Sequence, residues 1–456
     1  MISYLFYFII TIGVLVFIHE FGHFIAAKWM KMRVEVFSLG FGYRLVGWNK
    51  VKGLTFGNMK DDEDLGDNTD YRLSLIPLGG YVKISGMIDE SLDQKNLSSE
   101  PQPWEYRSKK PLAKIFVISA GVLMNLLLAY FIFFYNNAFI GKVVINTTQI
   151  GRIPETSAAY GTGLQENDVI LEINNQKVNN WEEVIKNIFV NTQGKDVTFL
   201  VKRDEKVEKI TVKREKIPSD PSQKLFLVPA KTKAFIADVM KGGSAQKSGL
   251  QAGDILLSIN DTLVLNSQQA VSMIKNKINK KIDIKVLRNK DTLLFQPMTN
   301  EDGKIGIAIN EIYDGPVTQY KYSIGEAAIK SFANIYEYTA LTFTMLGKVF
   351  KGDIKFQNAF GGPIKIAQFA TKSAEGGIVS FLSFLALLSL SLAIINILPI
   401  PGLDGGHIVI EIIEAVIRRE LPVKAKLFIQ QIGMGILLLL MVVVIYYDVI
   451  STFFKK

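Results

Sequence analysis

Four long apolar segments constrain the fold of this 456-residue chain more than any other feature. They cover about 1–24, 115–135, 378–398 and 427–447. Each is long enough to cross the hydrocarbon core of a bilayer, roughly 30 Å thick, as a helix. Lipid offers no partner for backbone N–H and C=O groups, so helices are favoured over irregular chain. The sequence predicts a polytopic α-helical membrane protein with four transmembrane helices.

The first apolar segment could instead be a secretory signal peptide, because it lies at the N-terminus. It has no basic start and no small-residue cleavage site. It also ends in the motif HEFGH (19–23), which would be out of place in a peptide that is removed. We therefore interpret it as a retained helix.

Lysines and arginines flank the predicted spans on the side of residues 28–114 and 399–426. Because such residues favour the cytoplasmic side, these two loops are expected in the cytoplasm. Both termini and residues 141–377 then lie outside. Lys455 and Lys456 favour the opposite side for the C-terminus.

The HEFGH motif supplies His19, Glu20 and His23 at the end of an otherwise uncharged span. An acidic group near the bilayer centre costs roughly 2.5–3.5 kcal/mol, which a bound metal would offset. On a helix the two imidazoles lie one turn apart, suited to two corners of a zinc tetrahedron, with the glutamate beside the metal. Two of the chain's three histidines lie in this motif. The motif predicts a zinc site with Glu20 as general base.

A third ligand is available in NILPIPGLDGGH, residues 396–407. Asp404 follows a helix end interrupted by proline and glycine, and such irregular backbone occurs at membrane depth only where protein or water shelters it. The alternative is an ordinary Leu-Asp-Gly turn.

Residues 163–174 (GLQENDVILEIN) align without gaps on residues 249–260 (GLQAGDILLSIN). In each copy a helical segment follows, at 181–189 and 267–276, and then strands such as VTFLVKR and IDIKVLR. The period fits a small domain present twice.

This pattern resembles the circularly permuted PDZ domain found beside bacterial membrane proteases, over 141–230 and 231–315. Copy one departs from the pattern, since Asn167 stands where copy two has Gly253. PDZ domains bind extended peptides at a sheet edge. The alternative role is a bulky cap that filters what reaches the membrane site.

Two further segments are predicted to lie near the membrane. Alternating residues 71–86, around Pro77 and the pair Gly79-Gly80, predict a membrane-associated β-hairpin. Residues 323–349 are amphipathic and predict a helix on the outer membrane face, not a fifth span.

The motifs together resemble the site-2 protease family, and their order resembles its bacterial regulator of sigma-E branch. They are HEFGH, Gly121 with Asn125, and the Asn-x-x-Pro-x-Pro-x-Leu-Asp-Gly run from Asn396. The resemblance implies zinc ligands His19, His23 and Asp404, with Glu20 as general base. It also implies that Asn396 holds the substrate backbone or the developing oxyanion, that Asn125 serves similarly, and that the hairpin with Gly79 and Gly80 holds the substrate extended. Asn125 is also explained as a helix-packing residue. His407 is either a residue that supports a metal ligand or a residue of the cytoplasmic surface, and the sequence favours neither.

The predicted fold class is four transmembrane helices with two β-rich PDZ-like extracytoplasmic domains and a membrane-associated β-hairpin. The predicted parts are span one (1–27), a cytoplasmic loop (28–114), span two (115–140), two PDZ-like domains (141–230 and 231–315), an amphipathic surface region (316–377), span three (378–398), a loop with LDGG (399–426) and span four (427–452).

The resemblance implies a zinc-dependent intramembrane endopeptidase of the bacterial inner membrane. Its expected substrates are single-pass membrane proteins, such as anti-sigma factors or remnant signal peptides. Membrane lipid and peptide ligands of the PDZ-like domains are further expected partners. The net charge of +9 is read as lysines on soluble faces and loops, so no nucleic acid is expected. The absence of cysteine excludes a cysteine nucleophile.

Three other functions compete with this prediction. A transporter or channel would use the intramembrane polar residues as an ion path, but it predicts inverted repeats and more spans. A catalytically silent scaffold presenting PDZ modules would not need all four of His19, Glu20, His23 and Asp404. A membrane-anchored soluble zinc protease would carry the metal motif in a soluble segment.

Overall fold

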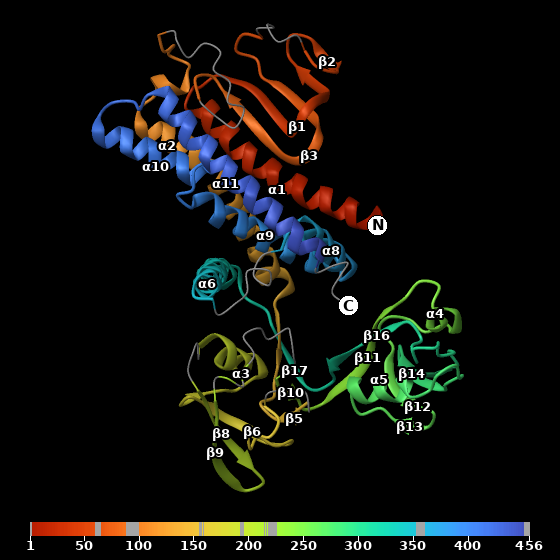
Figure 1. Cartoon of the computed structure of the whole chain (residues 1–456). Coiled ribbons are helices and arrows are strands. Elements are labelled where there is room, and N and C mark those ends of the chain that lie inside the picture. The colour runs from red at the N-terminus through yellow and green to blue at the C-terminus, as the bar shows by residue number, and fades with distance from the viewer. Residues whose placement is uncertain are drawn as a thin grey trace. The chain divides into compact units, whose positions relative to one another are not determined.

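The computed structural model describes residues 2–59, 65–87, 100–154, 157, 159–191, 196–213, 215, 217, 226–352 and 361–450. The chain divides into two compact units. One comprises Met1–Gly141 and Lys321–Lys456, and the other comprises Lys142–Tyr320 (Figure 1). Residues 451 and 452, at the end of the predicted fourth span, lie outside the described residues.

All four predicted apolar segments are helices long and apolar enough to cross a membrane. They are α1 (Ile2–Trp29), α2 (Pro111–Tyr135), α9 (Ile378–Ile397) and α11 (Val423–Val449). In α2 a proline occupies the first turn, where its missing N–H would have no helical partner. A π-helical turn, Asn136–Ile140, extends α2. The described part of the chain contains four such helices, the number that the sequence predicts.

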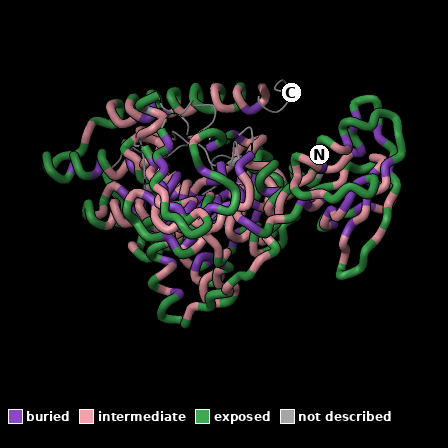
Figure 2. The backbone as a smooth tube through the Cα atoms, turned by 90° about the horizontal axis from the view of Figure 1, so that it is seen from below, coloured by how far each residue is buried: buried purple, intermediate pink, exposed green. Residues whose placement is uncertain are grey.

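The helices pack through apolar side chains at a few shared positions. Leu15 of α1, Phe133 of α2 and Leu390 of α9 belong to one buried cluster. Buried and exposed positions follow one another along single helices (Figure 2). Apolar residues on the outer faces are exposed, as expected for helices that contact lipid.

Among its described residues this unit also has the α-helices α6 (Ile324–Phe350), α8 (Pro363–Glu375) and α10 (Asp404–Ile417). A capping box formed by Ser323 and Glu326 begins α6. The helix predicted at 323–349 is thus present. It packs on α2, where the Nδ2 atom of Asn137 donates to Ser331 Oγ at 3.0 Å and Asn334 Oδ1 at 3.2 Å.

A small sheet lies beside the C-terminal part of α1 (Figure 1). Its strand order is β2-β1-β3, with β1 at Val34–Asn49, β2 at Gly53–Phe56 and β3 at Asp70–Ile84. Leu39 of β1 pairs with both Gly80 and Leu73 of β3. The first half of β1 therefore lies between the two halves of β3.

This arrangement corrects the predicted hairpin at 71–86. The chain does reverse direction there, but its two arms pair with β1 and not with each other. A local alternation of residues shows a strand and a turn, whereas the partner strand begins more than thirty residues earlier.

A buried arginine joins the three strands. Arg44 is 1% exposed, and it donates to both carboxylate oxygens of Asp70, at 3.1 and 2.9 Å. It also donates to Thr55 Oγ1 of β2 at 2.8 Å and to the carbonyl oxygen of Gly57, just after β2, at 2.9 Å. Paired, bidentate contacts of this kind are the form in which a guanidinium tolerates burial.

The unit Lys142–Tyr320 contains two β-rich modules. The first is a four-stranded sheet of order β7-β6-β8-β9, and the second a sheet of order β15-β14-β12-β11-β16 with β13 beside β12. The strands of the first are β6 (Val169–Ile173), β7 (Gln176–Lys177), β8 (Val197–Arg203) and β9 (Lys206–Val212). A separate two-stranded sheet pairs β5 (Ile150–Arg152) with β10 (Val228–Pro229). Those of the second are β11 (Thr232–Val239), β12 (Ile255–Ile259), β13 (Thr262–Leu263), β14 (Ile284–Arg288), β15 (Asp291–Phe295) and β16 (Ile307–Tyr313). The helices are α3 (Trp181–Lys186), α4 (Ser244–Ser248) and α5 (Ser267–Lys275), and β4 (Lys142–Ile145) pairs with β17 (Val317–Tyr320).

The two modules share an ion pair at matching positions of the repeated sequence. In copy one, Arg203 donates to Asp168 at 2.8 and 2.9 Å and to the carbonyl of Gly163 at 2.8 Å. In copy two, Arg288 makes the same contacts with Asp254, at 2.6 and 2.7 Å, and with the carbonyl of Gly249 at 2.9 Å. These carboxylates hold the pKa of each arginine above its ordinary value.

The departure of copy one at Asn167 has a conformational explanation. Asn167 has φ +72°, and Gly253 at the matching position has φ +94°. Asparagine is one of the few residues with a side chain that adopts this left-handed region readily. The turn is therefore kept although the residue changes.

We expect Arg44→Met to destabilise the sheet by about 1–3 kcal/mol, because the buried Asp70 carboxylate loses its bidentate partner and keeps only Arg72 at 3.2 Å and Asn49 at 3.3 Å. Thermal unfolding of the detergent-solubilised chain measures this, with Lys50→Met in the adjacent exposed turn as control. Adding Asp70→Asn to the variant should restore part of the loss. A midpoint equal to that of the control would show that the ion pair does not hold the sheet.

We expect Gly253→Val to destabilise copy two by about 1–2 kcal/mol, since a β-branched residue resists positive φ. Asn167→Gly should change copy one by less than about 1 kcal/mol. Hydrogen exchange of the full chain, read for each copy by mass spectrometry, separates the two effects. Equal protection of copy two in Gly253→Val and wild type would refute the conformational argument.

Candidate metal centre

Helix α1 presents two imidazoles from successive turns. The Nε2 atoms of His19 and His23 lie 3.3 Å apart. Their ring centroids are 4.9 Å apart, and the ring planes are inclined by 83°. The spacing of four residues places both on one face of the helix, as predicted.

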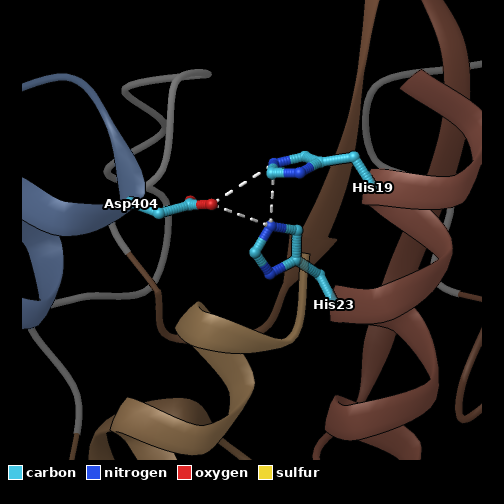
Figure 3. A group of neighbouring side chains, drawn as sticks. All are labelled: His19, His23 and Asp404. Carbon is cyan, nitrogen blue, oxygen red and sulfur yellow. Dashed lines mark hydrogen bonds and ion pairs between the residues drawn. The ribbon is translucent and has the colours of Figure 1, made fainter. Parts of the chain in front are cut away.

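Asp404, the first residue of α10, faces this pair (Figure 3). Its Oδ2 atom lies 3.3 Å from His19 Nε2 and 3.6 Å from His23 Nε2. This oxygen is buried and accepts no hydrogen bond from the described residues. Within the described ranges, these three residues form the one group of histidine, aspartate or glutamate ligand atoms close enough to share a metal ion.

The separations between these atoms fit zinc. Zinc bound to nitrogen and oxygen at about 2.0–2.2 Å in a tetrahedron has ligand atoms roughly 3.3–3.6 Å apart. The three observed separations, 3.3, 3.3 and 3.6 Å, are the edges of such a face. Three protein ligands leave one corner for water, as in catalytic zinc sites.

Gly121 of α2 makes room for the two rings. A Cβ atom there would lie 2.4 Å from His23 Nε2 and 2.7 Å from His19 Cε1. One turn earlier, the carbonyl oxygen of Val117 lies 2.9 Å from His23 Nδ1. Accepting the proton of that nitrogen leaves Nε2 unprotonated and able to bind a metal.

Asn125 is completely buried against His19, and it is absent from the cavity lining. Its amide nitrogen lies 3.1 Å from His19 Nδ1, while its Oδ1 atom has no partner among the described residues. The amide oxygen and nitrogen exchange places on rotation of the group. In that orientation Oδ1 accepts the proton of His19 Nδ1, which leaves Nε2 for the metal. The carbonyl of Asn125 accepts from Ser389 Oγ of α9 at 2.8 Å.

Asn396 lies in the last turn of α9, beside the face formed by the three ligand atoms. Its Nδ2 atom is 3.3 Å from His19 Nε2. Asn396 is therefore beside the metal position, where the resemblance places a substrate-holding amide.

A cavity opens over His19, His23 and Asp404. Its polar lining includes Glu20 and His407, and one wall is formed by Gly80, Tyr81, Val82 and Ile84 of β3. Gly80 lies close to Glu20, since a Cβ atom on Gly80 would be 3.1 Å from Glu20 Cγ. Gly79 instead lies against the ring of Phe41 and is not part of the lining. The remaining lining residues are Met87, Val117, Gly402 and Leu403.

Buried ionic groups fix α10, which carries Asp404, against α2. Glu411 of α10 accepts from Tyr106 Oη at 3.0 Å and lies 3.6 Å from Lys114 Nζ. Burial raises the pKa of Glu411 and of Tyr106 above their ordinary values. Glu414, one turn further, pairs with Lys426 at 2.7 Å.

Two supporting groups were not predicted from the sequence. The Val117 carbonyl is a backbone group in an apolar helix, and no residue type signals it. Gln430 of α11, which contacts His407, could have been noticed as a polar residue within a predicted span.

Comparison of the sequence with known protein families gives evidence that is independent of this geometry. A family model described as peptidase family M50 matches residues 7–440. This chain belongs to peptidase family M50. As a member of this family of site-2 proteases, it is a metalloendopeptidase.

Similar proteins share almost the whole length. The regulator of sigma E protease of Haemophilus influenzae is 32% identical over 94% of this chain and 95% of the relative. Protease RseP of Yersinia pestis is 31% identical, over 97% of both chains. The regulator of sigma-E protease RseP of Escherichia coli strain K12 is 29% identical, also over 97% of both.

We expect Gly121→Ala to weaken zinc binding at least about 10-fold, because its methyl group would overlap both imidazoles. The matched control is Gly13→Ala in α1, where a Cβ atom meets nothing within 4 Å. Competition against a fluorescent zinc chelator measures both. Wild-type zinc affinity in Gly121→Ala would contradict the close packing of α2 on the site.

Proposed function

We propose that this chain is a zinc-dependent intramembrane endopeptidase that cleaves single-pass membrane proteins within or near their transmembrane segments. One observation carries the proposal: three ligand atoms at zinc-tetrahedron separations lie at a helix whose composition suits a membrane span. Family membership supports the reaction class.

In this proposal His19, His23 and Asp404 hold the zinc ion. Bound zinc acts as a Lewis acid and lowers the pKa of its water to roughly 7. Glu20 takes a proton from the attacking water while the new carbon–oxygen bond forms. It then gives that proton to the leaving amine nitrogen as the carbon–nitrogen bond breaks. Val117 and Asn125 keep the two imidazoles in the tautomer that binds metal.

A helical substrate hides its carbonyl groups in its own hydrogen bonds, so the substrate must be held extended. The segment Gly80–Ile84 pairs with β1 along one edge and also lines the cavity. An unwound substrate strand can add to it by backbone hydrogen bonds. Gly80 has no side chain to keep such a strand away from Glu20. In this proposal Asn396, whose Nδ2 atom lies 3.3 Å from His19 Nε2, donates to the substrate backbone.

The remaining assignments follow the sequence predictions and the relatives. Two relatives carry the name regulator of sigma-E protease, which supports anti-sigma factors as substrates. Remnant signal peptides remain the second substrate class expected from the sequence. The unit Lys142–Tyr320 is proposed as a pair of extracytoplasmic PDZ-like domains, which either bind peptides or exclude large ectodomains. The bacterial relatives support a location in the inner membrane, and the basic loops favour an orientation with the metal centre toward the cytoplasm.

Glu20→Gln tests this function. Cleavage of a tagged single-span substrate in detergent should fall by about 10²–10⁴-fold, because the general base is lost. Zinc content should stay the same, since Glu20 is not a proposed ligand. Glu375→Gln on the exposed face of α8 is the control, and chelated wild type should be inactive.

Undiminished cleavage by Glu20→Gln would refute the mechanism. A wild-type protein that holds zinc but cleaves none of a panel of single-span substrates would favour the silent scaffold.

A further inference from the structure

The third histidine of the chain lies in the catalytic cavity without a role. His407 lines the same cavity as Glu20 and the three proposed ligands. It lies on α10, three residues after Asp404, so both side chains come from the first turn of one helix. It is not one of the three residues whose ligand atoms converge.

Helix α11 holds His407 and the loop before Asp404 in place. Gln430 Nε2 lies 3.3 Å from Nε2 and 3.4 Å from Nδ1 of the His407 ring. Three residues further along α11, Gly433 is pressed against Pro401, whose carbonyl oxygen a Cβ atom would meet at 1.9 Å. The ring therefore has a fixed place relative to Asp404.

Burial of the His407 ring disfavours its charged form. It lowers the pKa of His407 below its ordinary value of 6.5; the charge of Asp404 acts against this shift and that of Lys426 acts with it. A neutral ring has one acceptor nitrogen and one N–H. When Gln430 Nε2 donates to the acceptor nitrogen, the ring N–H is left as a donor for another group.

The proposed reaction needs such a donor. As the water oxygen bonds to the scissile carbon, the π electron pair of the carbonyl moves onto its oxygen, and the water proton passes to Glu20. When the carbon–nitrogen bond breaks, the carbonyl re-forms and the proton passes from Glu20 to the leaving amine. A fixed N–H directed at the oxygen stabilises the charge that develops there.

Apart from the ligand histidines, the cavity lining offers two side chains that can donate: Tyr81 and His407. The Tyr81 ring stacks on Phe41, and Arg72 lies 5.9 Å from its centroid. Tyr81 is thus packed into the sheet, whereas His407 shares the first turn of α10 with Asp404.

We propose that His407 is a catalytic residue that donates a hydrogen bond to the scissile carbonyl oxygen and keeps its proton throughout. The assignment rests on the proposed protease function and adds an oxyanion donor to it.

The test compares wild type, His407→Phe and His407→Gln of the full chain in detergent, with Ile412→Ala on the exposed face of α10 as control. His407→Phe should keep zinc. Its kcat should fall about 10²–10³-fold with KM changed less than about 3-fold, as for loss of an oxyanion donor. His407→Gln, which keeps an N–H donor, should recover part of kcat.

Binding gives a second readout that needs no turnover. A phosphinic peptide, which mimics the tetrahedral oxyanion, should bind His407→Phe at least about 10-fold more weakly than wild type. A substrate-derived peptide with an ordinary amide should bind both equally.

Wild-type kcat and phosphinic-peptide affinity in His407→Phe would overturn the proposal. Loss of zinc in that variant would also overturn it, because His407 would then support the metal site. Failure of zinc-loaded wild type both to cleave and to bind the phosphinic peptide would refute the protease function itself.

Discussion

The convergence of two imidazoles and a carboxylate on one point is the interaction on which the rest of this structure depends. His19 and His23 come from an apolar helix, and Asp404 from a helix nearly four hundred residues later in the chain. Three polar groups brought this close in an apolar setting are unfavourable unless a cation unites them. The separations between their ligand atoms match the edges of one face of a zinc tetrahedron, so a zinc ion is the cation that fits.

The surrounding helices can be understood as the support for this point. Gly121 lets α2 approach the two rings, and Val117 and Asn125 on the same helix contact their outer nitrogens. Helix α10 is fixed to α2 through Glu411 and to α11 through the ion pair of Glu414 with Lys426. Each imidazole thereby has a neighbour on α2 that contacts its outer nitrogen, as metal-binding histidines commonly do.

The sequence predicted those features that a local pattern encodes. Apolar length gave the four helices, and the HExxH spacing placed two ligands on one face. The duplicated module was visible because its alignment has no gaps. Asn167 looked like a departure only because residue identity was read without its backbone conformation, which the two copies share.

Features that depend on distant pairing could not be predicted. The segment 71–86 carries a turn signal, yet the strand that pairs with its arms is β1, which no local pattern connects to it. The contact of Asn125 with His19 and that of Gln430 with His407 likewise depend on how helices pack. A motif names a residue, but only packing decides whether it faces the substrate or another side chain.

Zinc K-edge X-ray absorption of the purified, zinc-loaded chain tests the central claim most directly. The account predicts one zinc per chain with about four nitrogen or oxygen neighbours at roughly 2.0–2.2 Å and the outer-shell scattering of two imidazoles. His23→Phe should reduce that scattering to one imidazole or abolish binding. A wild-type spectrum without imidazole scattering, or one unchanged in His23→Phe, would contradict it.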